Sequence, residues 1–336
     1  MASKPAGPLL SQFGNTLSHG GSFFMQASKR ERENVPYTKP ALSLETQANL
    51  LLSRGMIADR DQLIERLGVV SYYRLSGYWY PFLIFHNRER YNYFERDTKF
   101  DTIWKIYTFD RQLRVLVMDA IERIEVAVRT KLAYHHSLDY GSFAYIHHPK
   151  SVPNLKKTEH PRFICTVVNE TVRSKETFVN HFKDKYGADH LVLPIWMSTE
   201  LMSFGTVLTF LKGVPDNINA EVASMFKVPK KIFNSWFLTL NTVRNICAHH
   251  GRLWNREIGI KPFLPRKDAY PDWHIPAAMN PSRMFAILTI CRHCLNCVAP
   301  QSKWSGRVRA LIEKYPEIPL ASMGFPTGWE TSPYWK

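Results

Sequence analysis

The residues of this chain best suited to chemistry gather in one short segment, positions 244–256. Its arginines, asparagine and histidines are Arg244, Asn245, His249, His250, Arg252 and Arg256. An imidazole transfers protons near neutral pH, and guanidinium groups bind phosphate oxygens. A base, an acid and positive charge at phosphorus are sufficient to cut RNA through its own 2′-hydroxyl group. The segment is therefore a candidate ribonuclease site that needs neither a metal nor another cofactor.

Each side chain of this cluster has an expected role. Arg244 stabilises the charge on phosphate, and Asn245 orients the phosphate or an imidazole. His249 acts as general acid or base, and His250 assists. The spacing alone is also typical of an ordinary helix end, where histidines meet the negative end of the helix dipole and the arginine makes a salt bridge.

The helix that carries the cluster is predicted to begin after Pro229. One face of it is apolar: Phe233, Trp236, Phe237, Leu240, Val243 and Cys247. Arg244 falls within this apolar arc, so it needs an acidic partner, a phosphate or a neighbouring subunit. Gly251 is the expected residue after the helix, which would place both histidines in the last turn.

The spacing raises a geometric conflict. Residues five apart on a regular helix point about 140° away from each other. Arg244 and His249 therefore cannot meet on one straight helix. Either the helix unwinds near Ala248, or two copies of the segment face each other across a dimer.

The strongest helical periodicity in the chain runs from Phe100 to about Tyr134. Asp110 lies at the edge of its apolar stripe, and Arg114, one turn later, is the expected partner. Glu125 and Arg129 are also spaced to pair. Arg129 precedes His135 and His136 with spacing similar to that of the candidate site, but without the asparagine and the following arginines, and this second arrangement is interpreted as structural.

Further helices are predicted along the chain, and no strand pattern is evident. Ser43 and either Asp59 or Asp61 are expected to begin two short helices, the first ending at Gly55. Residues 137–161 are expected to form a loop. The remaining predicted helices cover 162–185, the segment through Met202 to Leu211, a turn or helix from Asp216, 280–298 opened by Asn280-Pro281, and 302–314. The predicted fold class is all-α, a helical bundle with appended pieces.

The formal net charge of +15 favours an anionic partner, with nucleic acid ahead of a membrane surface. No apolar run approaches the ~18 residues of a membrane span, and no signal peptide is evident. The five cysteines do not form a disulfide framework. Together these features predict a cytoplasmic protein.

Three other groups of residues have types that could form a site. Cys291, Cys294 and Cys297 lack the second ligand pair of a zinc site and are interpreted as part of a buried helix. The aromatic segment 71–82 can stack bases or fill a core, and Arg74 is its most suitable functional member. The loop histidines His147, His148 and His160 have no carboxylate cluster nearby, so no metal is assigned to them.

Several blocks of the sequence, in order, resemble the bacterial abortive-infection proteins of the AbiD and AbiF type. The matching blocks are Arg54-Gly55-Met56, Ser71 through Tyr78, Tyr107 through Arg114, Ile121 through Thr130, Pro194-Ile195-Trp196, Ser203-Phe204-Gly205, and Arg244 through Arg256. The resemblance implies a HEPN domain, a helical bundle whose signature is an arginine followed four to six residues later by a histidine. It further implies a metal-independent endoribonuclease toxin, a homodimer with a composite site, and in some relatives control by a small structured RNA.

Residues 1–38 are predicted to form a flexible tail, 39–95 an N-terminal helical subdomain, 96–260 the HEPN-like bundle with an insertion at about 137–190, and 261–336 a C-terminal helical extension.

Beyond the catalytic group, RNA contacts are expected from Arg252, Arg256, Arg74, Tyr73, Arg111 and Arg114. The expected partners are an RNA substrate, an antitoxin RNA and a second copy of the chain, with no membrane. Two alternatives remain: a non-catalytic RNA-binding protein that clamps phosphate, and a sensor subunit whose toxicity needs a partner.

Overall fold

The computed structural model describes residues 36–147 and 149–336. Within these residues it contains thirteen α-helices and a single two-stranded sheet, which confirms the all-α fold class. The chain divides into two compact units, of which the first ends at Trp104 and the second begins at Lys105. The predicted tail falls almost entirely outside the described residues, as does His148. The boundary predicted at residue 260 and the insertion at 137–190 stay predictions.

The first unit begins with three short helices, whose starts are capped by side chains. They are α1 (Leu44–Ser53), α2 (Arg60–Val69) and α3 (Tyr72–Trp79). Ser43 accepts a hydrogen bond from the backbone N–H of Thr46, and Asp59 accepts one from Gln62, as expected for N-cap residues. Gly55 follows α1 with a φ of 93°, a conformation that glycine adopts without strain.

A β-hairpin follows α3, so the expectation that the chain has no strands is wrong here. Strand β1 (Leu83–His86) pairs antiparallel with β2 (Glu89–Phe94). Its two-residue turn, Asn87-Arg88, has positive φ at both positions, as a type I′ turn requires. Strands this short, without a glycine in the turn, give little periodic signal in the sequence.

Helix α4 (Phe100–Tyr140) begins in the first unit and forms the long axis of the second. Its predicted apolar stripe is buried, from Ile106 through Ile124 to Val128. The helix extends about one and a half turns beyond the predicted end, so residues 137–140 are helical rather than part of a loop. The rest of the predicted loop contains the short helix α5 (Ala144–His147).

Two predicted helices are each divided into two by a break in the middle. The segment 162–185 forms α6 (Glu159–Arg173) and α7 (Thr177–Tyr186), and the segment through 211 forms α8 (Ile195–Leu201) and α9 (Phe204–Gly213). Ser203 explains the second break, because its hydroxyl caps α9 by accepting from the Thr206 N–H. Its own N–H donates to Glu170 of α6, which joins the two elements.

The remaining helices complete the second unit. They are α10 (Asp216–Ser224), α11 (Lys230–Ala248), α12 (Met284–Val298) and α13 (Trp304–Lys314). Asn280 does not open α12 as predicted: its side chain accepts hydrogen bonds from the backbone and hydroxyl of Ser282, and the helix starts only after Arg283. Short 3-10 turns occur at Tyr80–Phe82, Pro149–Ser151, Pro271–His274, Leu320–Met323 and Trp329–Thr331.

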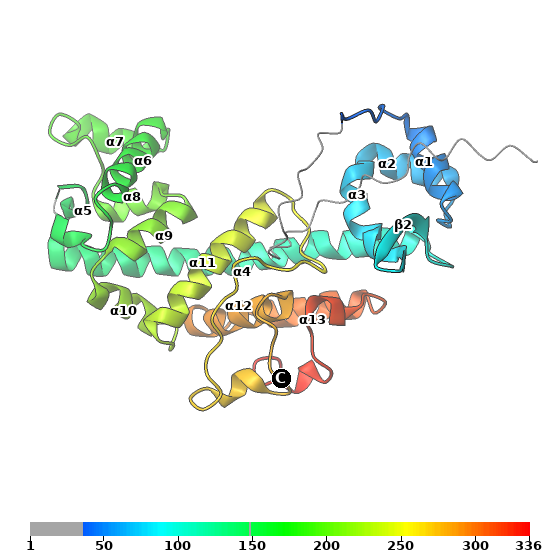
Figure 1. Ribbon diagram of the computed structural model, residues 1–336. Coiled ribbons are helices and arrows are strands. Elements are labelled where there is room, and N and C mark those ends of the chain that lie inside the picture. Colours follow the sequence, from blue (N-terminus) through cyan, green and yellow to red (C-terminus); the bar gives the residue numbers. More distant parts are fainter. Residues whose placement is uncertain (1–35, 148) are drawn as a thin grey trace, which may run out of the picture. The chain divides into compact units, whose positions relative to one another are not determined.

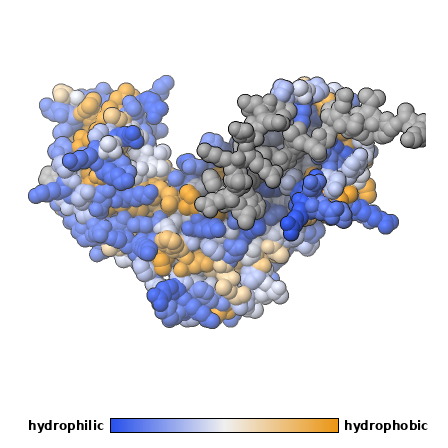
Figure 2. Space-filling model, viewed as in Figure 1, coloured by the Kyte–Doolittle hydropathy of each residue, from blue (hydrophilic) through white to orange (hydrophobic). Residues whose placement is uncertain are grey.

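Within the second unit, α12 and α13 run along α4, and α5 to α9 gather at the C-terminal end of α4 (Figure 1). The indole N–H of Trp304 donates to the carbonyl of Leu116 at 2.7 Å, which ties α13 to the middle of α4. On the face shown in Figure 2, hydrophobic residues reach the surface as patches among hydrophilic ones. No helix in the described residues is long and apolar enough to cross a bilayer.

Candidate functional site at the end of helix α11

Helix α11 presents the cluster as the sequence predicts, with one face in the core and the other in solvent. All six predicted apolar residues are buried: Phe233, Trp236, Phe237, Leu240, Val243 and Cys247. Burial raises the pKa of the Cys247 thiol to about 12, so this residue of the cluster stays a neutral packing group. Asn245, His249 and His250 are exposed.

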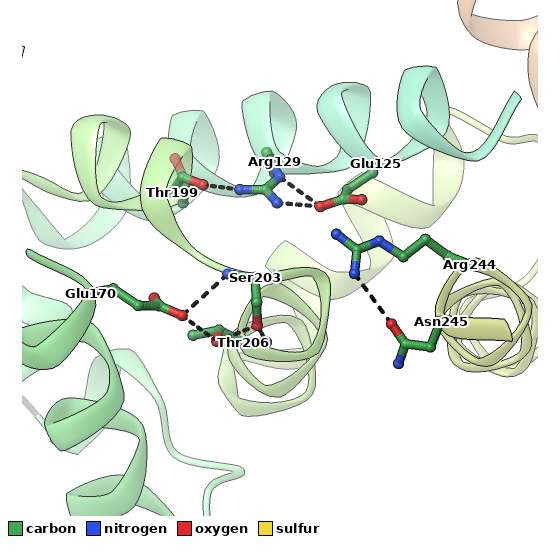
Figure 3. Close-up of polar contacts among 8 residues, drawn as sticks. All are labelled: Glu125, Arg129, Glu170, Thr199, Ser203, Thr206, Arg244 and Asn245. Carbon is green, nitrogen blue, oxygen red and sulfur yellow. Dashed lines mark hydrogen bonds and ion pairs between the residues drawn. The ribbon is translucent and has the colours of Figure 1, made fainter. Parts of the chain in front are cut away.

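Arg244 lies at the edge of the buried face and is half-buried. Its side chain donates one hydrogen bond, to the Oδ1 atom of Asn245 at 3.2 Å. The guanidinium of Arg244 points toward Glu125 of α4 and toward Ser203, the residue before α9 (Figure 3). It forms no ion pair with Glu125. Among residues 36–147 and 149–336, Arg244 has no acidic partner, so one of the three explanations for its position is removed.

The end of α11 is a Schellman motif, displaced by one residue from the prediction. The N–H of His250 donates to the carbonyl of Cys247 at 2.9 Å, and that of Gly251 donates to Ile246 at 2.7 Å. The left-handed residue is therefore His250, with a φ of 57°, and not Gly251. A non-glycine residue in this conformation costs about 1–2 kcal/mol.

Gly251 is required for a different reason. A Cβ atom at this position would lie 2.9 Å from the Ile246 Cγ2 atom and 3.1 Å from the Ile246 carbonyl oxygen. The next turn of chain therefore approaches the helix end closely only because residue 251 has no side chain. The two histidines lie just beyond the helix, at its C-cap and the following position, rather than within the last turn.

The helix stays regular up to His249, which decides between the two explanations of the Arg244–His249 geometry. The N–H of His249 still donates to the carbonyl of Asn245 at 3.0 Å, the ordinary helical bond. No unwinding therefore precedes His249, and the divergence of about 140° from Arg244 applies to this chain. Within one chain the two side chains leave the helix on different faces.

A buried ion pair on α4 holds the segment that follows the histidines. Asp110 is fully buried and accepts from Arg114 at 2.5 Å, the partner that the sequence predicts. Its other oxygen accepts the backbone N–H groups of Leu253 at 3.0 Å and Trp254 at 2.6 Å. Arg114 also donates to the carbonyl of Gly251 at 3.4 Å. The pair therefore fixes the path of residues 251–254.

This contact changes the role expected of Arg114. Arg114 is predicted to contact RNA, but its guanidinium is buried against Asp110 and the Gly251 carbonyl. We assign it a positioning role instead. Sequence reasoning recognised the pair but not its function, because the backbone that Asp110 binds lies more than 140 positions later in the chain.

Three other predicted RNA contacts belong to the second unit and remain suited to that role. Arg111 is exposed on α4, next to Asp110. Arg252 and Arg256 are half-buried in the segment after the turn, and Arg256 donates to the carbonyl of Arg252 at 3.3 Å. A side chain on residue 251 would meet the Arg256 guanidinium at 3.7 Å, so Arg256 lies close to the histidine turn.

The remaining two residues predicted to contact RNA, Tyr73 and Arg74, belong to the first unit. Both are exposed on α3, and 84% of Tyr73 is accessible. Tyr78 and Trp79, from the same aromatic segment, are buried. The aromatic segment 71–82 therefore has two roles: Tyr78 and Trp79 pack in a core, while Tyr73 lies in solvent.

The arrangement around Arg129 is structural, as predicted. Arg129 pairs with Glu125 and donates to the carbonyl of Thr199 (Figure 3), and the pair is largely buried rather than on the helix surface. His136 is fully buried against the rings of Tyr140 and Phe210. Burial lowers the pKa of His136 to about 4, so it stays neutral near pH 7.

The cysteine run lies in α12, where Cys291 and Cys294 are buried as expected of a core helix. Burial raises the pKa of both thiols. No group of three or more histidine, cysteine, aspartate or glutamate residues in the described part of the chain is placed to hold a metal ion.

Comparison with known proteins gives a match to one family. No curated protein and no solved structure matches the chain. A family model described as "Abi-like protein" matches residues 65–255, more than half of the chain, from α2 to the segment held by Asp110. The chain therefore belongs to the Abi-like family of abortive-infection proteins.

Proposed function

We propose that this protein is a metal-independent endoribonuclease of the HEPN type, acting as a toxin in abortive infection and similar to the AbiD and AbiF proteins. The observation that carries the proposal is Arg244. A half-buried guanidinium without an acidic partner in the described residues is suited to bind an anion. It stands about one and a half turns before two exposed histidines, which can transfer protons.

The reaction follows from these groups. One imidazole removes the proton from a 2′-hydroxyl, whose oxygen attacks the adjacent phosphorus. The bond to the 5′-oxygen breaks, and an imidazolium donates the proton that this oxygen needs. Arg244 stabilises the charge of the phosphorane, and Asn245, already bonded to Arg244, orients it. The products carry a 2′,3′-cyclic phosphate and a 5′-hydroxyl.

We propose that the site is composite, built by two copies of α11 related by a two-fold axis. The regular helix up to His249 directs Arg244 and His249 to different faces of one chain. A second copy supplies the missing side chain from the opposite direction. A dimer whose shared site depends on both chains also gives Arg244 an anionic partner, the bound phosphate.

The test uses purified full-length protein and single-stranded RNA in the presence of EDTA. Cleavage is expected with cyclic-phosphate ends, and His249→Ala and Arg244→Ala should each abolish it. His135→Ala is the matched control, because that histidine follows Arg129 with similar spacing outside the site, and it should cleave as the parent does. Undiminished cleavage by both site variants would refute the residue assignment, and a requirement for added metal would refute the mechanism.

We further propose that a small structured RNA holds the toxin in check, on the basis of the resemblance and the net charge of +15. Sequencing the RNA that copurifies with the His249→Ala protein should return one abundant structured species besides substrate fragments. Recovery of only random cellular RNA would contradict this regulation while leaving the nuclease proposal intact.

The second candidate function is a non-catalytic RNA-binding protein. The exposed or half-buried arginines Arg111, Arg252 and Arg256 around the turn favour it, because they can clamp phosphates without chemistry. In that case His249→Ala leaves both RNA affinity and toxicity unchanged. Binding would still weaken steeply with salt, so the effect of His249→Ala on toxicity separates the two functions.

A further inference from the structure

The β-hairpin of the first unit exposes aromatic side chains that the candidate site does not use. The exposed fractions are 59% for Phe85, 42% for Tyr91 and 48% for Tyr93. The end of the hairpin at Phe94 is anchored: the ring of Phe94 packs on Trp79, and its N–H donates to the carbonyl of Arg54 at 2.9 Å. The remaining aromatic residues are not needed to fill a core.

The strand register places these side chains on definite faces. Phe85 pairs with Arg90, and His86 pairs with Glu89. Because side chains alternate along a strand, Tyr91 and Tyr93 share a face with His86, while Phe85 and Arg90 occupy the opposite face. Tyr91 and Tyr93 are two positions apart on the strand, which separates their Cα atoms by about 6.7 Å. This spacing is about twice the 3.4 Å rise between stacked bases, so one base fits between the two rings.

Positive charge is found on the Phe85 face of the hairpin and at the tip of its turn. The guanidinium of Arg90 lies 4.5 Å from the centre of the Tyr80 ring and 5.3 Å from that of Phe85. Its hydrogen bonds go to the carbonyls of Tyr80 and Leu83, and it pairs with no carboxylate within the residues that the structure covers. Arg88, at the tip of the turn, is exposed. Arg90 lies on the face opposite Tyr91 and Tyr93, which share their face with Glu89, so the positive charge available beside these tyrosines is Arg88.

We propose that this hairpin is a binding surface for single-stranded RNA, in which bases stack on Tyr91 and Tyr93 while Arg88, at the tip of the turn, neutralises a phosphate. Aromatic rings interleaved with arginine are the means by which proteins hold single strands without reading sequence. A peptide that adds a third strand is a poorer occupant of β1, because the register shift between Leu83 and Phe85 interrupts the hydrogen-bonding edge there.

The inference deepens the proposed function by naming how a substrate strand is held, but its test does not depend on cleavage. Full-length protein carrying His249→Ala is titrated into a fluorescein-labelled oligouridylate of about twelve nucleotides, and fluorescence anisotropy gives the Kd. Tyr91→Ala and Tyr93→Ala should each weaken binding by about five- to a hundredfold, the range measured for loss of a base–aromatic stack. Tyr91→Phe and Tyr93→Phe keep the ring and should keep the affinity.

The matched control is Tyr134→Ala, which removes a tyrosine of similar exposure (55%) from α4 and should leave the Kd unchanged. If both Tyr91→Ala and Tyr93→Ala bind the RNA with the affinity of the parent, the proposal is overturned. The same result is expected if the surface binds a protein instead of RNA. Equal losses in the alanine and phenylalanine variants overturn stacking as the cause. If the parent protein proves not to cleave RNA, the proposed function fails while the binding result for the hairpin still stands.

Discussion

Replacement of Asp110 by asparagine tests whether the buried ion pair shapes the histidine turn. Asparagine keeps an oxygen for the N–H groups of Leu253 and Trp254, but it turns an amide NH₂ toward the Arg114 guanidinium, which then has no counter-charge. Removing one partner of a buried pair costs about 3–5 kcal/mol. Since 1.4 kcal/mol corresponds to a factor of ten, the equilibrium for opening the 251–254 segment should rise by about a hundredfold or more.

The assay is hydrogen exchange of the full-length protein, followed in the peptides that contain Leu253 and Trp254. Their amides should lose protection in Asp110→Asn by that factor. Asp119→Asn is the matched control, because Asp119 and Arg123 have the same spacing on the same helix at 2.8 Å but are partly exposed. That pair is worth less than about 1 kcal/mol, so little change is expected.

A double-mutant cycle completes the test. Arg114→Met in the Asp110→Asn background removes the uncompensated guanidinium, so the double variant should recover part of the lost protection. If the two substitutions are simply additive, or if Asp110→Asn leaves both amides as protected as in the parent, the ion pair does not hold the turn.

Three further predictions concern strain, pH and assembly. His250→Gly should raise the free energy of unfolding by about 1 kcal/mol, because glycine adopts the left-handed conformation at this position without strain, whereas His250→Ala should not; equal unfolding midpoints in denaturant for the two variants would contradict this reading. The depressed pKa of His136, about 4, means that the folded state favours the neutral ring, so its contribution is complete above pH 6.5 and is lost as the pH falls toward 4, up to about 3 kcal/mol. Thermal denaturation across this range should show the loss in the parent and a smaller one in His136→Phe, and parallel curves would argue against it. Mixing inactive Arg244→Ala and His249→Ala chains should restore about a quarter of parental cleavage, because half of the random dimers regain one of two composite sites; no restoration after subunit exchange would count against Arg244 and His249 acting from different chains.

Long periodic helices were predictable from the sequence, and interruptions within helices were not. The stripe of α4 and the apolar face of α11 repeat over many turns, so their burial follows from spacing alone. The break at Ser203 combines a hydroxyl cap on α9 with a contact to Glu170, a residue of another helix that accepts the Ser203 N–H. The sequence does not predict the hairpin, because Asn87-Arg88 lacks the glycine that marks a tight turn.

In the candidate site, too, the features set by local patterns could be predicted, and those set by contacts between distant residues could not. The residue types and the conflict between Arg244 and His249 could be derived from helix geometry. The usual preference for glycine predicts the left-handed position at Gly251. In the structure Gly251 instead allows the close approach of Ile246, and His250 adopts the left-handed conformation. The role of Asp110 depends on a contact between distant parts of the chain, for which local patterns carry no information.

The tie between Asp110 and the backbone of residues 253–254 also has a consequence for the order of folding. Arg244, His249 and His250 are all present in a nascent chain once residue 250 has been made, yet the segment after the turn is held in place only when Asp110 closes a loop of more than 140 residues. Closing a loop of that length is slow and requires the intervening helices to be packed. A growing or truncated chain that stops before Leu253 therefore holds Arg244, His249 and His250 without the tie to Asp110, so the proposed activity should appear only after Trp254 has been made.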